Sequence, residues 1–316
     1  MRRLVFSIVF VLSVAAFLFF LIFFKHEFKR TVHTYLPVTT ATEQFSKPEN
    51  LNKWFVPFNS SEKSEDNRID TEAKTITSGN YQLKVFNQSL YSSILNFSKG
   101  KKNREFLFSA IPDTSSIGGT NIIMVYKNSY FNEWFAKDEL VKKALNSFAD
   151  LKEYIDDTKR MYGYEIKPVK VTDTLFLFKR ITVPLVDKSK SVKEVFESLI
   201  SYAAKYKLNY NGNRIFYSQK NGESITLFAS IGIANDITIP ESEEFEIKRM
   251  PYDKKLLEAT FQGKYSEVSA VLDALKKFID DNNLSTMGIP FEKFISDGVD
   301  FNDDQIVQMK VYYPIL

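Results

Sequence analysis

Two stretches, SVKEVFESLISYAAKYKL at residues 191–208 and EVSAVLDALKKFIDDNNL at residues 267–284, decide the fold of the second half of this chain. When each residue is compared with the one 76 positions further on, apolar residues fall on apolar residues, at the three- and four-residue spacing of one helix face. A fixed offset over so many steps predicts an internal duplication. The matched pairs are Val192 with Val268, Val195 with Val271, Phe196 with Leu272, Leu199 with Leu275, Tyr202 with Phe278, Ala203 with Ile279 and Leu208 with Leu284.

Both copies have the same expected order of elements. Strands at 175–181 and 256–261 precede the two helices, and strands at 226–233 and 307–313 close the copies. The offset also matches Gly212 with Gly288, and the turn Asn221-Gly222 with Asp297-Gly298. Two such strand-helix-strand-strand halves predict a pseudo-twofold domain, and a concave site on its axis is the natural place for a ligand.

Three segments of the second copy resemble a known family. KLLEATFQGKY at 255–265, GIPFEKF at 288–294 and VYYPI at 311–315 are similar, in this order, to motifs of the GyrI-like small-molecule-binding domain, the effector-binding domain of AraC- and MerR-type regulators. The resemblance covers residues 168–316. It implies a pocket between the two halves, lined by aromatic side chains, where Glu292 and Tyr265 face a cationic or polar ligand. The chain departs from the family at Phe294, where the family has tyrosine, and at residues 187–189, where the first copy lacks the GxY motif.

Glu292 is the main candidate for ligand binding. The 76-residue offset matches it with Phe216, so that one carboxylate would face one phenyl ring. A buried carboxylate without a partner is costly, which favours a functional role. The alternative is a surface residue at a strand edge, beside Lys293. The other candidates are aromatic residues that would line the pocket or, alternatively, pack in an ordinary core: Tyr265, Phe291, Phe294, Phe216, Tyr217, Tyr312 and Tyr313.

The first half predicts a different α+β domain. A strand at 31–38 precedes a helix that Pro48 splits, then come strands near 81–86, 91–97, 105–111 and 121–126, and a long helix over 140–155. The segments VTTATEQF at 38–45, PENLNKWFVPF at 48–58 and FADLKEY at 148–154 resemble the START-like (SRPBCC, polyketide-cyclase) superfamily. That resemblance implies a helix-grip fold, with a curved sheet around the long helix and an apolar cavity that binds hydrophobic molecules. Trp54 and Trp134 would then cap the cavity or pack in the core.

The N-terminus carries an apolar run over residues 4–24, in which Ser7 and Ser13 are the polar residues. A helix of this length spans roughly 30 Å, the thickness of a bilayer core, and predicts an N-terminal transmembrane helix. A cleaved signal peptide is the alternative, but the charged segment KHEFKR at 25–30 follows instead of a small-residue cleavage site. We expect a single-pass protein of a bacterial cytoplasmic membrane, with its soluble domains outside the cytoplasm.

Composition excludes several kinds of function. The chain has no cysteine and two histidines, which excludes disulfide scaffolds and thiol chemistry and disfavours zinc sites and histidine triads. The net charge is +3, and residues 1–30 carry +4 of it, so the remainder is near neutral and lacks the positive surface of a nucleic-acid-binding protein. We expect no metal site, no cofactor and no nucleic-acid partner.

These observations predict three parts: a membrane anchor at 1–30, a START-like domain at 31–165 and a GyrI-like domain at 166–316. The predicted function is a membrane-anchored protein that senses, carries or sequesters a hydrophobic or cationic small molecule. A second hypothesis is a hydrolase of reactive electrophiles in which Glu292 acts as general base, if burial raises its pKa. A purely structural role, with side chains filling both cavities, is the third.

Overall fold

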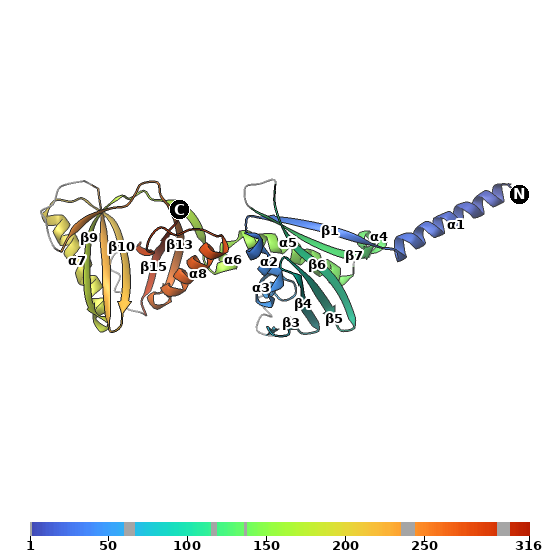
Figure 1. Cartoon of the computed structure of the whole chain (residues 1–316), viewed down its shortest axis with the longest axis horizontal. Helices are drawn as coiled ribbons and strands as arrows, with labels where there is room; N and C mark the ends of the chain where they lie inside the picture. The colour runs from blue at the N-terminus through green and yellow to red at the C-terminus, as the bar shows by residue number, and fades with distance from the viewer. Residues whose placement is uncertain (1, 60–66, 115–118, 136–137, 235–243, 296–303) are drawn as a thin grey trace. The chain divides into compact units, whose positions relative to one another are not determined.

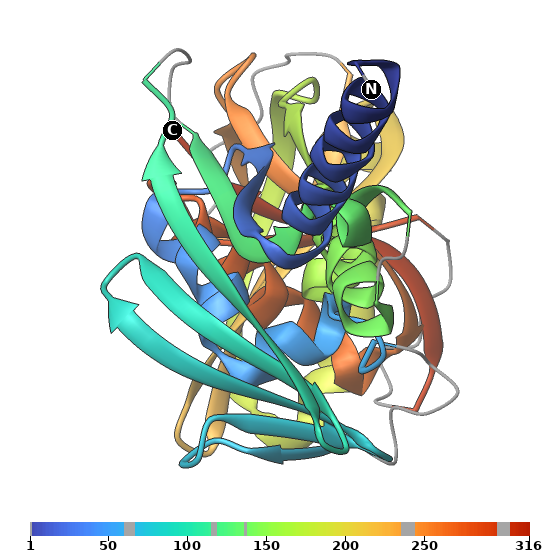
Figure 2. The same cartoon turned by 90° about the vertical axis from the view of Figure 1, so that its right-hand side faces the viewer.

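The computed structural model describes residues 2–59, 67–114, 119–135, 138–234, 244–295 and 304–316, except for the side chains of residues 2–5 and 7–9. The chain divides into two compact units, Met1–Asp157 and Thr158–Leu316, each built on one antiparallel sheet with helices packed against it (Figures 1 and 2). The predicted mixed α+β fold is confirmed. The START-like and GyrI-like identities of the parts, with their boundaries near 30 and 165, stay predictions.

Helix α1 (Arg2–Phe23) covers most of the expected membrane anchor. Within the described part of the chain, no helix combines the length and the apolar character that crossing a membrane requires. Residues 4, 5 and 7–9 of the expected anchor have side chains outside that part. The structure therefore does not support the predicted transmembrane helix.

The first unit contains a seven-stranded meander. Its strand order is β1, β7, β6, β5, β4, β3, β2, and every neighbouring pair is antiparallel. The predicted strand at 31–38 is placed too late, because alternating residues from Lys25 onward pair with β7 and Val38 already begins a helix. The bounds are β1 (Lys25–Thr34), β2 (Arg68–Asp70), β3 (Thr75–Ser78), β4 (Tyr81–Ser89), β5 (Ser92–Lys99), β6 (Lys102–Pro112) and β7 (Thr120–Ser129).

Four helices accompany this sheet: α2 (Val38–Ser46), α3 (Pro48–Trp54), α4 (Tyr130–Trp134) and α5 (Glu139–Asp156). As predicted, Pro48 separates the first two, since proline fits the first turn of a new helix but not the interior of an old one. Asp138 caps α5 by accepting a hydrogen bond from the Val141 backbone N–H at 2.8 Å. The strands of the sheet curve around α2, α3 and α5 in Figure 1.

Aromatic rings pack between this sheet and its helices. Phe108 of β6 lies 5.6 Å from Phe45, 6.2 Å from Trp54 and 5.7 Å from Phe148, measured between ring centroids. Trp54 is fully buried, and its indole N–H donates to the Gln44 carbonyl at 3.0 Å. Trp134, in contrast, is 63% exposed. Trp54 is therefore a core residue and Trp134 a surface residue.

The second unit contains an eight-stranded antiparallel sheet with the order β12, β9, β11, β10, β14, β15, β13, β8. Helices α7 (Lys188–Lys205) and α8 (Val268–Asp281) pack on it, and short α6 (Thr158–Tyr162) contacts α8. The strand bounds are β8 (Ile166–Lys170), β9 (Leu175–Pro184), β10 (Tyr210–Asn221), β11 (Ser224–Ile233), β12 (Glu246–Arg249), β13 (Lys255–Lys264), β14 (Phe291–Phe294) and β15 (Ile306–Pro314).

Both halves of this unit have the order strand, helix, strand, strand, but the offset between them differs from the predicted 76. Strand β9 begins at Leu175 and β13 at Lys255, and the one-turn helices η2 (Leu185–Asp187) and η3 (Tyr265–Glu267) follow at the same separation of 80 residues. Four residues are close to one helical turn, so a shift from 76 to 80 leaves the apolar helix face aligned. The matched turn at 297–298 lies outside the described residues.

Candidate ligand-binding site

The two halves of the second unit meet where β10 pairs with β14. In this antiparallel pair Phe216 lies opposite Glu292, Ile215 opposite Lys293 and Arg214 opposite Phe294. Side chains opposite each other in an antiparallel sheet point to the same face, and successive residues alternate between faces. Phe216 and Glu292, matched by the sequence comparison, are thus direct neighbours on one face.

That face packs against α7 and α8, and we call it the helix face. Phe216 is fully buried and Phe294 is 5% exposed, and both belong to the main hydrophobic core of the unit. Their rings lie 6.5 and 6.4 Å from Phe196 of α7. Because Glu292 alternates with Phe291 and Lys293 along β14, its carboxylate lies on the helix face beside this aromatic core.

Glu292 accepts one hydrogen bond from the described residues, from the Tyr265 hydroxyl to Oε2 at 3.0 Å. Tyr265 is buried in η3, and the ammonium of Lys188, at the start of α7, lies 4.9 Å from the centroid of its ring. Desolvation raises the pKa of Glu292 from 4.5 to about 7, although the Tyr265 hydrogen bond and the charge of Lys188 oppose that rise. Glu292 can therefore exchange a proton near neutral pH.

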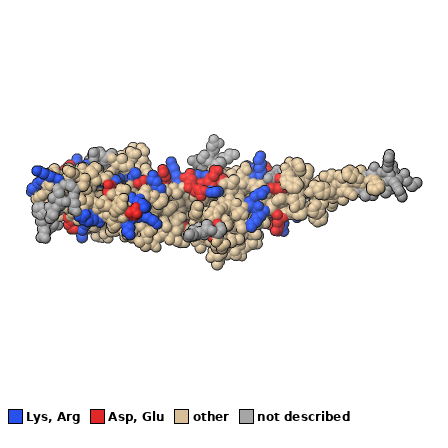
Figure 3. Space-filling view, turned by 90° about the horizontal axis from the view of Figure 1, so that it is seen from above, with Lys and Arg blue, Asp and Glu red and all other residues tan. Residues whose placement is uncertain are grey.

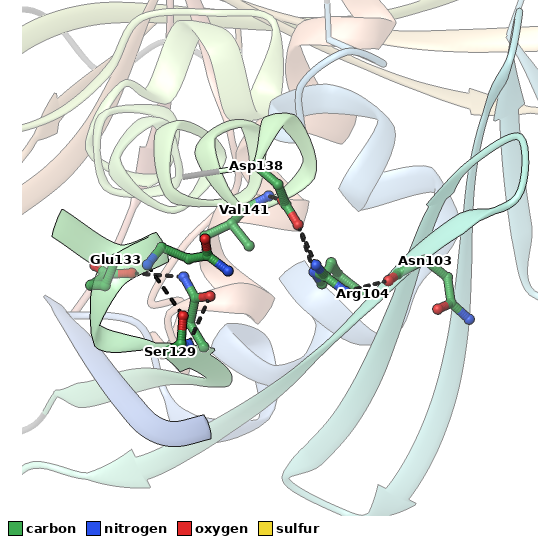
Figure 4. A network of polar contacts seen from close by, with 8 residues as sticks. Asn103, Arg104, Ser129, Glu133, Asp138 and Val141 are labelled. Carbon is green, nitrogen blue, oxygen red and sulfur yellow. Dashed lines mark hydrogen bonds and ion pairs between the residues drawn. The ribbon is translucent and has the colours of Figure 1, made fainter. Parts of the chain in front are cut away.

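Two other buried carboxylates have stronger compensation than Glu292. Glu133 of the first unit, 4% exposed, accepts from the Tyr126 hydroxyl at 3.0 Å and from the Asn128 amide at 3.2 Å, and pairs with Arg30 at 3.0 Å. Figure 4 shows Glu133 near Ser129, and close by Arg104 bound to the carboxylate of Asp138 and the carbonyl of Asn103.

Glu258 of β13 is the second of these carboxylates, and it is also 4% exposed. It accepts from the Tyr312 hydroxyl at 2.7 Å and pairs with Lys310 at 3.1 Å and Lys167 at 3.5 Å. Burial raises its pKa, but the hydrogen bonds from Tyr312 and Lys310 and the charges of both lysines lower it overall. Compensated buried carboxylates stabilise a fold, whereas Glu292, with one neutral donor, is the better candidate for ligand binding.

The structure divides the predicted ligand-binding residues between the two faces of the sheet. Glu292, Phe294, Phe216 and Tyr313 lie on the helix face, and Tyr265 approaches Glu292 from η3. Phe291 stacks on Tyr312 and Tyr217 packs against Phe228, and these four residues lie on the opposite face, which we call the outer face. The seven candidates therefore do not line one pocket.

Sequence reasoning missed the contribution of Lys188. The residues 187–189 attracted attention only because they replace the GxY motif in the first copy. With the structural separation of 80 residues, Lys188 matches Val268, so a cation stands in one half where the other half has an apolar residue. That asymmetry was the available signal, and the wrong offset concealed it.

No protein-family model matches the chain, and no curated protein does. Among solved structures, it is similar to the C-terminal domain of EcmrR, with a TM-score of 0.39 and 15% identity over 48% of this chain and 98% of that one. An uncharacterised conserved protein from Listeria innocua gives 0.35 and 14% over 52% and 98%. DynU16, a putative protein in the dynemicin biosynthetic locus, gives 0.31 and 9% over 91% and 86%. With TM-scores below 0.5, these similarities carry no argument about function.

Proposed function

We propose that the second unit binds a small hydrophobic molecule that carries a cation or a hydrogen-bond donor, with Glu292 as its polar anchor. The observation that carries this proposal is the desolvated carboxylate with one neutral donor, the Tyr265 hydroxyl at 3.0 Å. A charged hydrogen bond contributes about 1.5 to 3 kcal/mol, so a ligand cation would supply stabilisation that the protein itself lacks.

The surroundings of Glu292 favour an apolar ligand body. Its cross-strand neighbour Phe216 and the adjacent Phe294 are buried aromatic residues, and Tyr265 contributes a third ring. Apolar walls with one polar group that fixes orientation are typical of small-molecule sites. Because the pKa of Glu292 is about 7, binding of a cation should release a proton below that pH.

The affinity of a lipophilic cation tests this proposal. We expect the full chain to bind tetraphenylphosphonium in calorimetric titration, and to bind tetraphenylborate, which has the same shape and the opposite charge, far more weakly. Glu292→Gln keeps the shape of the side chain and should weaken tetraphenylphosphonium binding by roughly ten- to a hundredfold. Glu246→Gln, a charge-matched change at a side chain that is 53% exposed, should leave the affinity unchanged. Equal affinities of the Glu292→Gln and parent chains would refute the role of Glu292.

The GyrI-like identity of this unit is part of the proposal and rests on the three motifs of the second copy, two of which contain Tyr265 and Glu292. A START-like identity of the first unit is supported by its meander and closing helix α5. The expectation of no nucleic-acid partner is supported by Figure 3, where Lys and Arg side chains are interspersed with Asp and Glu on the visible face of each unit.

Membrane attachment in a bacterial cytoplasmic membrane, with both units outside the cytoplasm, is likewise part of the proposal. It rests on the apolar sequence of residues 4–24. Phe10 of α1 is 70% exposed and Phe17 is 61% exposed, and such side chains need an apolar environment or a partner surface. Fractionation of cells that express the full chain would test the attachment.

A second candidate function is hydrolysis of a reactive electrophile, with Glu292 as general base. It is favoured by the pKa of about 7, since a general base works best when its pKa is near the working pH. The test is the rate at which the chain hydrolyses an epoxide such as styrene oxide. An activity that rises as the pH passes 7 and disappears in Glu292→Gln would favour catalysis. Cation binding without hydrolysis would favour binding alone.

A further inference from the structure

A second cavity lies within the second unit, on the outer face of its sheet, away from Glu292. Its volume is about 260 Å³, and its lining comes from β8 and the residues after it, β9, β10, β13, β14 and β15. Phe291 of β14, whose neighbour Glu292 points to the helix face, forms part of this lining. Drug-sized ligands occupy pockets of roughly 300 to 1,000 Å³, so this cavity suits a smaller molecule.

One side of the cavity is apolar and aromatic. The ring of Phe291 stacks on the ring of Tyr312 with centroids 5.1 Å apart and planes inclined by 23°. Tyr312 also belongs to a small apolar cluster with Leu256 and Val171, against which Met250 packs. This flat, partly buried surface suits an aromatic or other apolar ligand body.

The other side of the cavity has two adjacent lysines. Lys293 of β14 and Lys310 of β15 are direct cross-strand partners, so both side chains leave the same face side by side. Like charges in this arrangement repel each other, and a carboxylate compensates each of them. Asp173 lies 3.1 Å from the Lys293 ammonium, and Glu258 lies 3.1 Å from that of Lys310.

Both ammonium groups retain donors for a ligand. Among the described residues, each has a single carboxylate partner, whereas a lysine ammonium has three N–H donors. The side chains of Lys293 and Lys310 are 27% and 36% exposed, so a molecule entering from solvent can reach them. Glu258 is held by Tyr312 as well, and is therefore not available as an anchor for a cation.

We propose that this cavity binds a small aromatic carboxylate, with the ligand carboxylate between the Lys293 and Lys310 ammonium groups and its ring on Phe291. An anion there would relieve the repulsion between the two lysines, which their own carboxylates relieve only from one side each. This site goes beyond the proposed function, because it lies on the other face of the sheet and selects the opposite charge.

The test is calorimetric titration of the full chain with 2-naphthoate, with the neutral 2-naphthylmethanol as matched ligand. We expect a dissociation constant on the order of 0.1 to 1 mM for 2-naphthoate, typical of a ligand of this size, and at least tenfold weaker binding of the alcohol. Added salt should weaken 2-naphthoate binding, since the contact is between charges. Equal binding of both ligands, or none of 2-naphthoate at millimolar concentration, would overturn the proposal.

Variants of the lysine pair locate the site. Lys293→Met keeps the apolar stem and should weaken 2-naphthoate binding at least tenfold, while Lys293→Arg should restore most of the affinity. Lys264→Met removes the same charge from β13 at a side chain that is 54% exposed and paired with Asp304, and should change the affinity less than twofold. An unchanged affinity in Lys293→Met, or equal losses in Lys293→Met and Lys264→Met, would overturn the assignment.

A gain in affinity provides an independent check. Asp173 competes with the ligand for Lys293, so Asp173→Asn should tighten 2-naphthoate binding severalfold, a change that simple damage to the fold would not produce. A weaker affinity in a folded Asp173→Asn chain would contradict the proposed position of the carboxylate. Failure of tetraphenylphosphonium to bind would leave these results unaffected, because that probe tests the helix face.

Discussion

Glu292→Gln should stabilise the second unit, and should do so more at high pH than at low pH. The folded chain holds the pKa of Glu292 at about 7, against 4.5 for the unperturbed group. Between these two values the unfolded chain has lost a proton that the folded chain keeps. The free energy of unfolding therefore falls as the pH rises from 4.5 to 7, and glutamine removes that fall.

The size of the effect follows from the two pKa values. A tenfold change in an acid dissociation constant corresponds to about 1.4 kcal/mol, so the full difference corresponds to about 3 kcal/mol above pH 7. Part of the Glu292 side chain reaches solvent, which screens its charge, and we expect about 1 to 2 kcal/mol in practice. At pH 5 most of this gain should be absent.

Urea unfolding of the full chain can measure this effect in one unit at a time. Both tryptophans, Trp54 and Trp134, lie in the first unit, so fluorescence follows that unit, while far-ultraviolet circular dichroism follows both. Glu292→Gln should shift the dichroism transition of the second unit and leave the fluorescence transition in place.

Glu258→Gln is the matched control for this prediction. Although burial opposes it, interactions with Tyr312 and Lys310 hold the pKa of Glu258 below its usual value. Its contribution to stability is present above pH 4.5 and is lost as the pH falls through the folded pKa. The control should therefore destabilise the unit by about 1 to 3 kcal/mol at neutral pH, and less in acid. Destabilisation by Glu292→Gln at pH 8 would refute the view that its charge is uncompensated.

Three further predictions concern the site and the units. Tyr265→Phe removes the donor to Glu292 and should raise the pKa of that carboxyl further, as carbon-13 NMR titration can measure; an unchanged pKa would mean that the hydrogen bond is absent in solution. The fragment 158–316 should fold alone with a cooperative urea transition, and a molten fragment would show that this unit depends on the rest of the chain. The full chain should fractionate with membranes and a fragment that begins at Thr31 should not; recovery of both in the soluble fraction would contradict an anchor at residues 4–24.

Local sequence patterns predicted most elements of the structure. Alternation of apolar residues located β4 to β7, and Pro48 located the break between α2 and α3, because both signals act over a few residues. The duplication was visible, but periodicity alone could not distinguish offsets of 76 and 80 residues. Only the strands, which have no four-residue period, determine that offset.

The candidate site was predicted less completely than the fold. Glu292 and Tyr265 came from the family resemblance, and the structure joins them through a hydrogen bond. Phe291 was assigned to the same pocket because an aromatic residue gives no sign of which face of a strand it occupies, and one position changes the face. The outer cavity was missed entirely, since Glu258 and Lys310 are 52 residues apart and meet only through strand pairing.

The most direct test of the account is the pKa of the Glu292 carboxyl, measured by carbon-13 NMR with and without tetraphenylphosphonium. An uncompensated carboxylate that anchors a cation should titrate near pH 7 in the free protein, and its pKa should fall when the cation binds. A pKa near 4.5 in the free protein would contradict the desolvated site. A pKa near 7 that saturating cation leaves unchanged would show that Glu292 does not contact the ligand.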